Sequence, residues 1–169
     1  TLARSMALSL LAGERDEIAE GHQVAHLVAA QSHPDYAELC RLEKDTGDLA
    51  RSITVDQVRG LHRLLESAPS LSQRRIILID SADDLERGGA NALLKNLEEP
   101  PKSTIFLLIS HSPSRLLPTI RSRCRTLRFS PLREEKMRAV ITAQQPGISE
   151  AELNNLVAMG EGSPGRALG

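Results

Sequence analysis

The chain has 169 residues, of which 40% are hydrophobic and 25% are charged, and its formal net charge is −1. This length and composition are typical of one globular domain with a hydrophobic core and the beginning of a second domain. The near-neutral charge argues against a function based on overall attraction to nucleic acid or to an acidic membrane surface. With two Phe, one Tyr and no Trp, the chain is also too poor in aromatic residues to bind single strands by base stacking.

The cysteines and the ends of the chain indicate its setting. Cys40 and Cys124 lie far apart and the sequence shows no signal peptide, so we expect a reduced, cytoplasmic protein. No apolar run approaches the roughly 18 residues of a membrane-spanning helix. The chain begins at Thr1 within a helical pattern, without a cap or an initiator Met, and it ends abruptly at Gly169. We therefore expect a fragment of a longer protein.

The first part of the chain is predicted to contain helices and one short strand. Apolar residues recur at helical spacing in three segments, residues 1–11, 17–30 and 52–67. Thr54 or Ser52 is a suitable cap for the third helix. Between the second and third helices, residues 36–42 alternate in polarity enough to predict a strand, and the polar residues 46–52 predict a loop.

Two buried parallel strands are predicted in the middle of the chain. Residues 74–80 contain four consecutive large aliphatic side chains closed by a carboxylate, and residues 104–110 contain a similar apolar run that ends at Ser110. Such runs, apolar on both faces, are typical of parallel strands buried between layers of helices. A helix over residues 90–97 separates them, and a short helix over residues 118–123 and a last strand over residues 125–129 follow.

Beyond Pro131 the pattern predicts helices only. They cover residues 134–144 and 150–159, and another begins within residues 160–165. Strands that alternate with helices, followed by helices alone, predict an α/β domain over residues 1–130 and the start of a small all-helical domain over residues 131–169.

Asp80 is the first candidate for a functional residue. A carboxylate at the end of a buried parallel strand lies at the edge of the sheet where α/β proteins bind ligands. In P-loop nucleotidases such an aspartate helps to hold Mg²⁺. The alternative is an aspartate that only ends the strand and caps the next turn, and this feature alone leaves both readings open.

Several motifs beyond Asp80 carry a family resemblance. Ala-Asn-Ala-Leu-Leu-Lys-Asn-Leu-Glu-Glu-Pro-Pro at residues 90–101, together with Asp80, resembles the Walker B segment and following helix of bacterial clamp-loader subunits of the AAA+ class. Ser122, Arg123 and Cys124 match the Ser-Arg-Cys motif of that family. Further counterparts occur at residues 33–36, 52–59 and 162–168. The matches thus run in order from His33 to the end of the chain.

The resemblance implies a P-loop NTPase-like parallel sheet flanked by helices, followed by a helical lid domain. The phosphate loop, Gly-x-x-x-x-Gly-Lys-Ser/Thr, does not occur in this chain, and residues 1–4 resemble the segment that follows it. In the family, the strand before that loop lies in the middle of the sheet. We therefore expect this chain to lack the first strand and the phosphate loop, and its sheet to lack a central member.

The chain departs from the family at the end of the strand. ATP-hydrolysing members have Asp-Glu there, and the Glu polarises the attacking water, whereas this chain has Asp80-Ser81. A serine hydroxyl cannot serve as that base because its pKa is far too high. Asp83 and Asp84 would have to reach back to replace it. The resemblance with this departure implies a subunit that does not hydrolyse ATP by itself.

Arg123 is the residue that the resemblance marks as functional. In the family, the arginine of the Ser-Arg-Cys motif reaches across a subunit interface toward ATP bound by the neighbour, as an arginine finger in trans. A guanidinium suits this role because its fixed, permanently charged donors match phosphate oxygens. A solvated surface arginine is the alternative. Four neighbouring arginines form either a DNA phosphate contact or a solvated face, namely Arg115, Arg121, Arg125 and Arg128.

Three further residue groups are weaker candidates. Ser110, with His111, could sense a γ-phosphate or simply cap the end of its strand. Arg166 lies one place later than the second nucleotide-sensing arginine of motor subunits. Four residues invite a zinc hypothesis, His22, His26, His33 and Cys40. Zinc modules of the family use four cysteines in this region, so we expect no metal here.

The leading prediction is a non-hydrolysing clamp-loader subunit with no cofactor of its own, which acts on the ATP–Mg of a neighbouring subunit. Its implied partners are the gamma/tau-like ATPase subunits, the delta subunit, the sliding clamp indirectly, and primer-template DNA through the complex, with no membrane. One alternative is an ATP-hydrolysing, gamma/tau-like motor subunit. Another is a DNA-binding module that uses the arginines without nucleotide chemistry.

Overall fold

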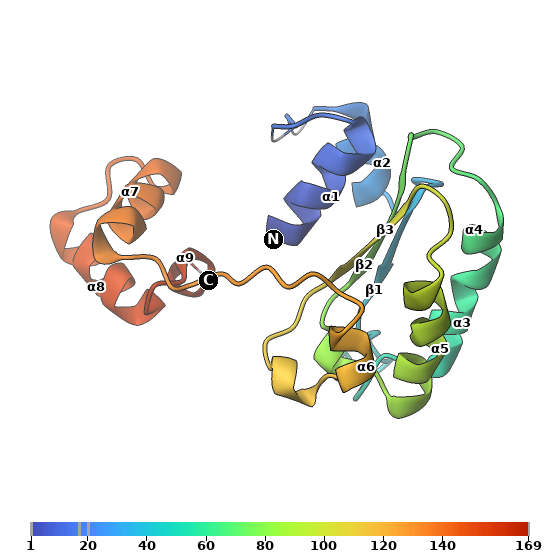
Figure 1. The fold of residues 1–169 in the computed structure, drawn as a ribbon. Helices are drawn as coiled ribbons and strands as arrows, with labels where there is room; N and C mark the ends of the chain where they lie inside the picture. Colours follow the sequence, from blue (N-terminus) through green and yellow to red (C-terminus); the bar gives the residue numbers. More distant parts are fainter. Residues whose placement is uncertain (1, 17, 20, 169) are drawn as a thin grey trace. The chain divides into compact units, whose positions relative to one another are not determined.

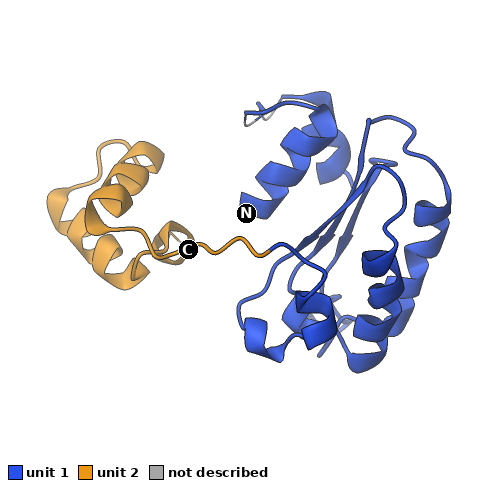
Figure 2. Ribbon diagram, in the orientation of Figure 1, with its two compact units in different colours: residues 1–125 blue, residues 126–169 orange. Residues whose placement is uncertain are grey.

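The structure is a computed structural model that describes residues 2–16, 18–19 and 21–168. The chain divides into two compact units, Thr1–Arg125 and Thr126–Gly169 (Figure 2). The sequence placed the division five residues later, between residues 130 and 131. Each unit has its own hydrophobic core and is described separately.

Unit 1 is built on a small parallel sheet. Its strands are β1 (Tyr36–Leu39), β2 (Arg75–Ile79) and β3 (Thr104–Leu108), in the order β1-β2-β3. In the register of this sheet, Ile77 of the middle strand lies opposite Ala37 on one side and Phe106 on the other. The predicted α/β class with parallel strands is confirmed.

Helices cover both faces of the sheet (Figure 1). On one face lie α1 (Leu2–Ala12) and α2 (Gln23–Ala29), and on the other lie α3 (Val55–Gly60), α4 (His62–Glu66) and α5 (Arg87–Glu98). All five residues of β2 are buried, so its side chains reach both layers. Ile76 packs with the α1 and α2 side, whereas Ile77 and Ile79 pack with α3, α4 and α5.

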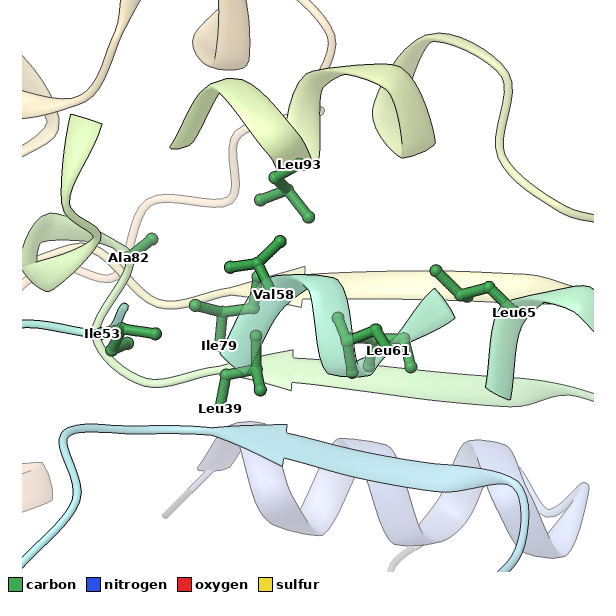
Figure 3. Packing of buried hydrophobic residues seen from close by; sticks show 9 residues of the cluster. Leu39, Ile53, Val58, Leu61, Leu65, Ile79, Ala82 and Leu93 are labelled. Carbon is green, nitrogen blue, oxygen red and sulfur yellow. The ribbon is translucent and has the colours of Figure 1, made fainter. Parts of the chain in front are cut away.

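The larger core cluster joins the sheet to α3, α4 and α5 (Figure 3). Thr54 caps α3, because its side chain accepts a hydrogen bond from the backbone of Gln57 while Gln57 bonds back to the backbone of Thr54. Gly89 of α5 faces α3, and a Cβ there would make ordinary contacts, 3.4 Å from Val58 and 3.5 Å from the Ile53 carbonyl. Leu93 of α5 is fully buried in this cluster.

Short elements follow the sheet strands in unit 1. The 3₁₀ turns η1 (Ala82–Asp84) and η2 (Pro113–Arg115) come after β2 and β3, and α6 (Pro118–Arg121) follows η2. Proline stands at the start of both η2 and α6, where its missing N–H is not needed. These elements place the motif residues 122–124 directly after α6.

Unit 2 contains three helices, α7 (Glu134–Gln144), α8 (Glu150–Gly160) and α9 (Pro164–Leu168), among its described residues. Met137, Ile141, Leu153 and Ala167 form its buried core. The helices predicted over residues 134–144 and 150–159 are thereby confirmed. Gly162 has φ +83°, and its carbonyl accepts a hydrogen bond of 2.8 Å from the Leu132 N–H.

The strand predicted over residues 125–129 is wrong. Residues 125–130 have no regular secondary structure and are exposed, with Leu127 at 60% and Phe129 at 70% exposure. A strand requires a hydrogen-bonded neighbour, and no strand of the described chain pairs with this segment. The alternating apolar residues of this segment therefore do not form a strand.

Two other expectations need correction. β3 was expected to be buried like β2, but its five residues are only half-buried because it pairs with β2 on one side and ends the sheet on the other. The helix expected over residues 17–30 is confined to Gln23–Ala29, where His22 caps it through Nδ1. Glu17, its expected start, lies outside the described residues.

Candidate functional site

A pocket of 470 Å³ lies at the carboxyl ends of the three strands. Its lining comes from the segments that follow each strand, because parallel strands present their carboxyl ends at the same edge of the sheet. Arg41 follows β1, Asp80 and Ser81 follow β2, and Arg115 follows β3. The structure therefore brings Asp80 to the edge that the sequence predicted.

Asp80 and Ser81 form the turn that leaves β2. The Asp80 N–H donates a hydrogen bond of 2.8 Å to the Leu39 carbonyl, which extends the ladder between β1 and β2. The Ser81 hydroxyl donates to Asp83 Oδ2 at 3.0 Å and accepts from the Asp83 N–H at 3.3 Å, so Ser81 caps η1. The peptide bond between Asp80 and Ser81 is cis. Ser81 is thus a turn residue held by Asp83.

Asp83 connects the segments that follow β2 and β3. Its carboxylate accepts hydrogen bonds from Ser110 Oγ at 2.7 Å, from the His111 N–H at 2.6 Å and from the Ser112 N–H at 3.2 Å. Burial opposes the charge of this carboxyl, but these bonds and that from Ser81 together lower the pKa of Asp83 below its ordinary value. Asp83 therefore stays ionised and is fully engaged in holding the two loops together.

Ser110 and Asp84 also have partners within the fold. Ser110 donates its hydroxyl hydrogen to Asp83. The sequence left two roles open for Ser110, a phosphate sensor and a cap at the end of its strand, and this bond fits the cap. Asp84 Oδ2 lies 3.1 Å from Arg41 Nε in an ion pair. Asp83 and Asp84 are the two carboxylates that would have had to replace the missing base. Asp83 holds the loops, and Asp84 pairs with Arg41.

Arg123 lies two residues beyond α6 and folds back onto it. Its Nη1 donates to the Thr119 carbonyl at 2.9 Å and to Ser122 Oγ at 3.3 Å. Its Nη2 lies 2.6 Å from Oε1 of Glu98, the last residue of α5. The Arg123 side chain is 33% exposed, so the guanidinium remains within reach of a partner at the surface. It does not line the pocket beside Asp80.

The flanking residues of the Ser-Arg-Cys motif support this turn. The Ser122 hydroxyl donates to the Thr119 carbonyl at 3.1 Å and ends α6. Cys124 is half-buried, and this burial raises the pKa of its thiol, which disfavours the reactive thiolate. Ser122 and Cys124 therefore shape the segment that carries Arg123.

The other basic candidates differ in their surroundings. Arg115 lines the pocket, whereas Arg121 and Arg125 are exposed in unit 1 and Arg128 is exposed in unit 2. Arg166 belongs to α9 of unit 2, where its Nη1 lies 2.6 Å from Glu161 Oε2.

Two of the three histidines considered for zinc have local partners. His22 caps α2 and lies 3.8 Å from Glu14, and His33 Nδ1 accepts a hydrogen bond of 3.1 Å from the Asp35 N–H. Burial lowers the pKa of His33. Within residues 2–16, 18–19 and 21–168, no three His, Cys, Asp or Glu side chains cluster as metal ligands would.

Two residues of this region were not found as functional candidates from the sequence. Asp83 was considered only as a replacement base, although its carboxylate joins two loops. Glu98 was part of a recognised motif without a role of its own. Ser110, the partner of Asp83, lies 27 residues further along the chain, and Arg123, the partner of Glu98, lies beyond another helix. No local pattern therefore marks these pairs.

Comparisons with known proteins agree with this architecture. A sequence model of the family described as "DNA polymerase III, delta subunit" matches residues 1–133. The delta' subunit of DNA polymerase III from Pseudomonas aeruginosa is 45% identical over 102 residues, which are 60% of this chain and 30% of that protein. The tau subunit of DNA polymerase III from Bacillus subtilis is 32% identical over 125 residues, which are 72% of this chain and 22% of that protein.

A solved structure shares the fold. The crystal structure of a DNA polymerase III gamma subunit-related protein from Thermotoga maritima superposes with a TM-score of 0.53 at 24% sequence identity. The match covers 72% of this chain and 40% of that one. Among the described residues, no helix is long and apolar enough to cross a bilayer.

The parallel sheet, the strand-end Asp80 and the motif that carries Arg123 define an α/β protein with an AAA+-related fold. The chain belongs to the DNA polymerase III delta subunit family, because the family match covers most of its length. The resemblance inferred from the motifs is therefore confirmed. The chain spans less than a third of the length of the two curated relatives described above.

Proposed function

We propose that this chain is part of a clamp-loader subunit that does not hydrolyse ATP itself and donates Arg123 to ATP–Mg bound by a neighbouring subunit. The observation that carries this proposal is the arrangement of Arg123. Its guanidinium is held at the surface of unit 1 by contacts from α5 and α6, away from the pocket beside Asp80. A group held in this way serves a site on another molecule better than a site on its own.

The surroundings of Asp80 support the lack of hydrolysis. A catalytic base must lie within hydrogen-bond reach of the attacking water and must be free to accept its proton. Ser81 is a poor base and is bonded to Asp83, while Asp83 is bonded to two loops. Asp84 is paired with Arg41. The described residues around Asp80 thus do not supply the base that ATP hydrolysis requires, although Asp80 itself is suited to contact Mg²⁺.

The chemistry of a guanidinium supports the role in trans. Charge on the transferred phosphoryl group is spread over its oxygens, and an arginine supplied by a neighbour stabilises that charge. The arginine fingers of GTPase systems increase the rate by about 10³–10⁵-fold. Arg123 has the exposure and the planar donor group that this contact needs.

The partners follow from the proposed role. The delta' and tau names of the relatives indicate a DNA polymerase III assembly, so the ATP would be bound by gamma/tau-like subunits, with a delta subunit as a further neighbour. The sliding clamp and primer-template DNA would be engaged through the complex.

ATP hydrolysis by the full-length subunit, alone and reconstituted with the ATPase subunits, clamp and primed DNA, tests the proposal. We expect no turnover by the subunit alone. In the complex, Arg123→Ala should lower kcat at least about tenfold, whereas Arg121→Ala, a matched loss of an exposed arginine, should leave it near the wild-type value. Equal activity of both variants would contradict the donated arginine.

An ATP-hydrolysing motor subunit is the second candidate, and the similarity to a tau subunit favours it. This alternative predicts turnover by the full-length subunit alone that is lost in Asp80→Ala. Such a result would show that another carboxylate replaces the missing base, and the proposed lack of hydrolysis would be wrong.

A further inference from the structure

Glu98 contacts the guanidinium of Arg123 from a second helix. Glu98 is the last residue of α5, and its Oε1 lies 2.6 Å from Arg123 Nη2. The other two contacts, to the Thr119 carbonyl and to Ser122 Oγ, come from α6 and its end and both involve Nη1. The position of the guanidinium is therefore set by α5 and α6 together.

The contact from Glu98 restrains a rotation of the guanidinium that the two contacts at Nη1 still allow. An arginine side chain has many rotamers, and ordering it costs conformational entropy. Contacts at Nη1 alone allow the planar group to turn about that end. A carboxylate at Nη2 fixes the opposite end, and so it fixes the plane of the group.

We propose that Glu98 is a positioning residue for Arg123, which orders the guanidinium in the direction in which it is presented to a neighbour's phosphate. This inference rests on the proposed function of Arg123. A guanidinium has five N–H donors, and the contacts to Thr119, Ser122 and Glu98 use three of them, which leaves two for phosphate oxygens. Ordering the group before the subunits meet removes that entropic cost from the catalytic complex.

The exposure of the pair argues against a latch that withholds Arg123. Glu98 is 49% exposed and Arg123 is 33% exposed, so water and salt weaken their attraction. A triphosphate with its several charges competes easily with one exposed carboxylate. Glu98 can therefore direct the arginine without preventing its contact with ATP.

The test uses the complex reconstituted with the full-length subunit carrying Glu98→Gln, which keeps the shape of the side chain and removes its charge. We expect kcat for ATP hydrolysis to fall about two- to fivefold, the size of an exposed ion-pair contribution, with KM for ATP unchanged. Glu98→Asp, which keeps the charge, should restore most of the rate. Glu99→Gln is the matched control, since Glu99 is exposed and adjacent, and it should leave kcat unchanged.

A comparison in the Arg123→Ala background separates positioning from a general structural role. There, Glu98→Gln should cause no further loss of kcat, because the group that it orders is gone. A further loss in that background, an unchanged rate of the single variant or a raised rate would each overturn the inference. If Arg123→Ala lowers kcat and Glu98→Gln does not, the inference alone fails. If Arg123→Ala has no effect, the proposed function fails with it.

Discussion

Asp83 and Ser110 join the loops that follow two neighbouring strands, through a hydrogen bond of 2.7 Å from Ser110 Oγ to Asp83 Oδ1. Asp83 comes from η1 after β2, and Ser110 follows β3. The same carboxylate accepts bonds from the His111 and Ser112 backbone. One carboxylate therefore joins the segments that follow β2 and β3, and its bonds to them depend on its charge.

Asp83→Asn should destabilise the protein because an amide nitrogen replaces one of the accepting oxygens. The amide nitrogen can take the place of Oδ1 and face Ser110, but the bonds from the His111 and Ser112 N–H groups then go to a neutral oxygen, and we expect a loss of about 1–3 kcal/mol in the free energy of unfolding. Urea unfolding of the full-length subunit, followed by circular dichroism, measures it. Asp45→Asn makes the same change at an exposed position and should alter stability by no more than about 0.5 kcal/mol. Equal losses in the two variants would contradict the role of Asp83.

Asp35 should make stability depend on pH in the acid range. Its buried carboxylate accepts three backbone hydrogen bonds, from Ser70, Leu71 and Ser72, at 2.7–2.8 Å. Burial raises the pKa of Asp35, but the bonds and the nearby His33 outweigh it, and the net pKa lies below the ordinary value of 3.8. A lowered pKa in the folded state means that the charged form stabilises the fold above pH 3.8 and that this stabilisation is lost as the pH falls further.

We therefore expect Asp35→Asn to be less stable than the wild type by about 1.5–3 kcal/mol at pH 7, the range for hydrogen bonds to a charged group. The difference should shrink when unfolding is measured below pH 3.8, because the wild-type carboxyl then takes up a proton. His33 faces Asp35 and helps to lower its pKa, so loss of the attraction between the two side chains is part of the difference. A gap that stays constant from pH 7 into this acid range would show that the charge is irrelevant.

Gly162→Ala should destabilise unit 2 more than Gly147→Ala does. Both glycines have positive φ, +83° and +89°, so each substitution carries the backbone cost of that conformation, about 1–2 kcal/mol. At Gly162 a Cβ would also lie 2.5 Å from Pro131 Cβ, whereas at Gly147 nothing lies within 4 Å. This overpacking should lower the free energy of unfolding of Gly162→Ala by a further ~1–3 kcal/mol. Amide hydrogen exchange of α7 and α8 measures the difference, and equal effects would exclude a tight contact at Gly162.

Local patterns were sufficient for much of the fold. The aliphatic run of β2 predicted a buried parallel strand because it is apolar on both faces, and all five of its residues are buried. The sequence offered Thr54 or Ser52 as the cap of the next helix, and Thr54 caps α3, because a capping residue is recognised by its own neighbours. The helix over residues 134–144 was predicted with its observed bounds, since the periodicity of its apolar residues lies within the element itself.

The motifs of the sequence determined the family and identified Arg123 and Asp80 as candidates, because motif residues are neighbours along the chain. Only the tertiary structure decided that residues 125–129 form no strand, that Asp83 holds two loops and that Glu98 contacts Arg123. The contacts of Asp83 and Glu98 depend on partners far away in the sequence. The outcome for residues 125–129 depends on whether a neighbouring strand pairs with them. Hydrogen bonds and ion pairs between distant segments form only when the chain has folded, and a local pattern carries no record of them.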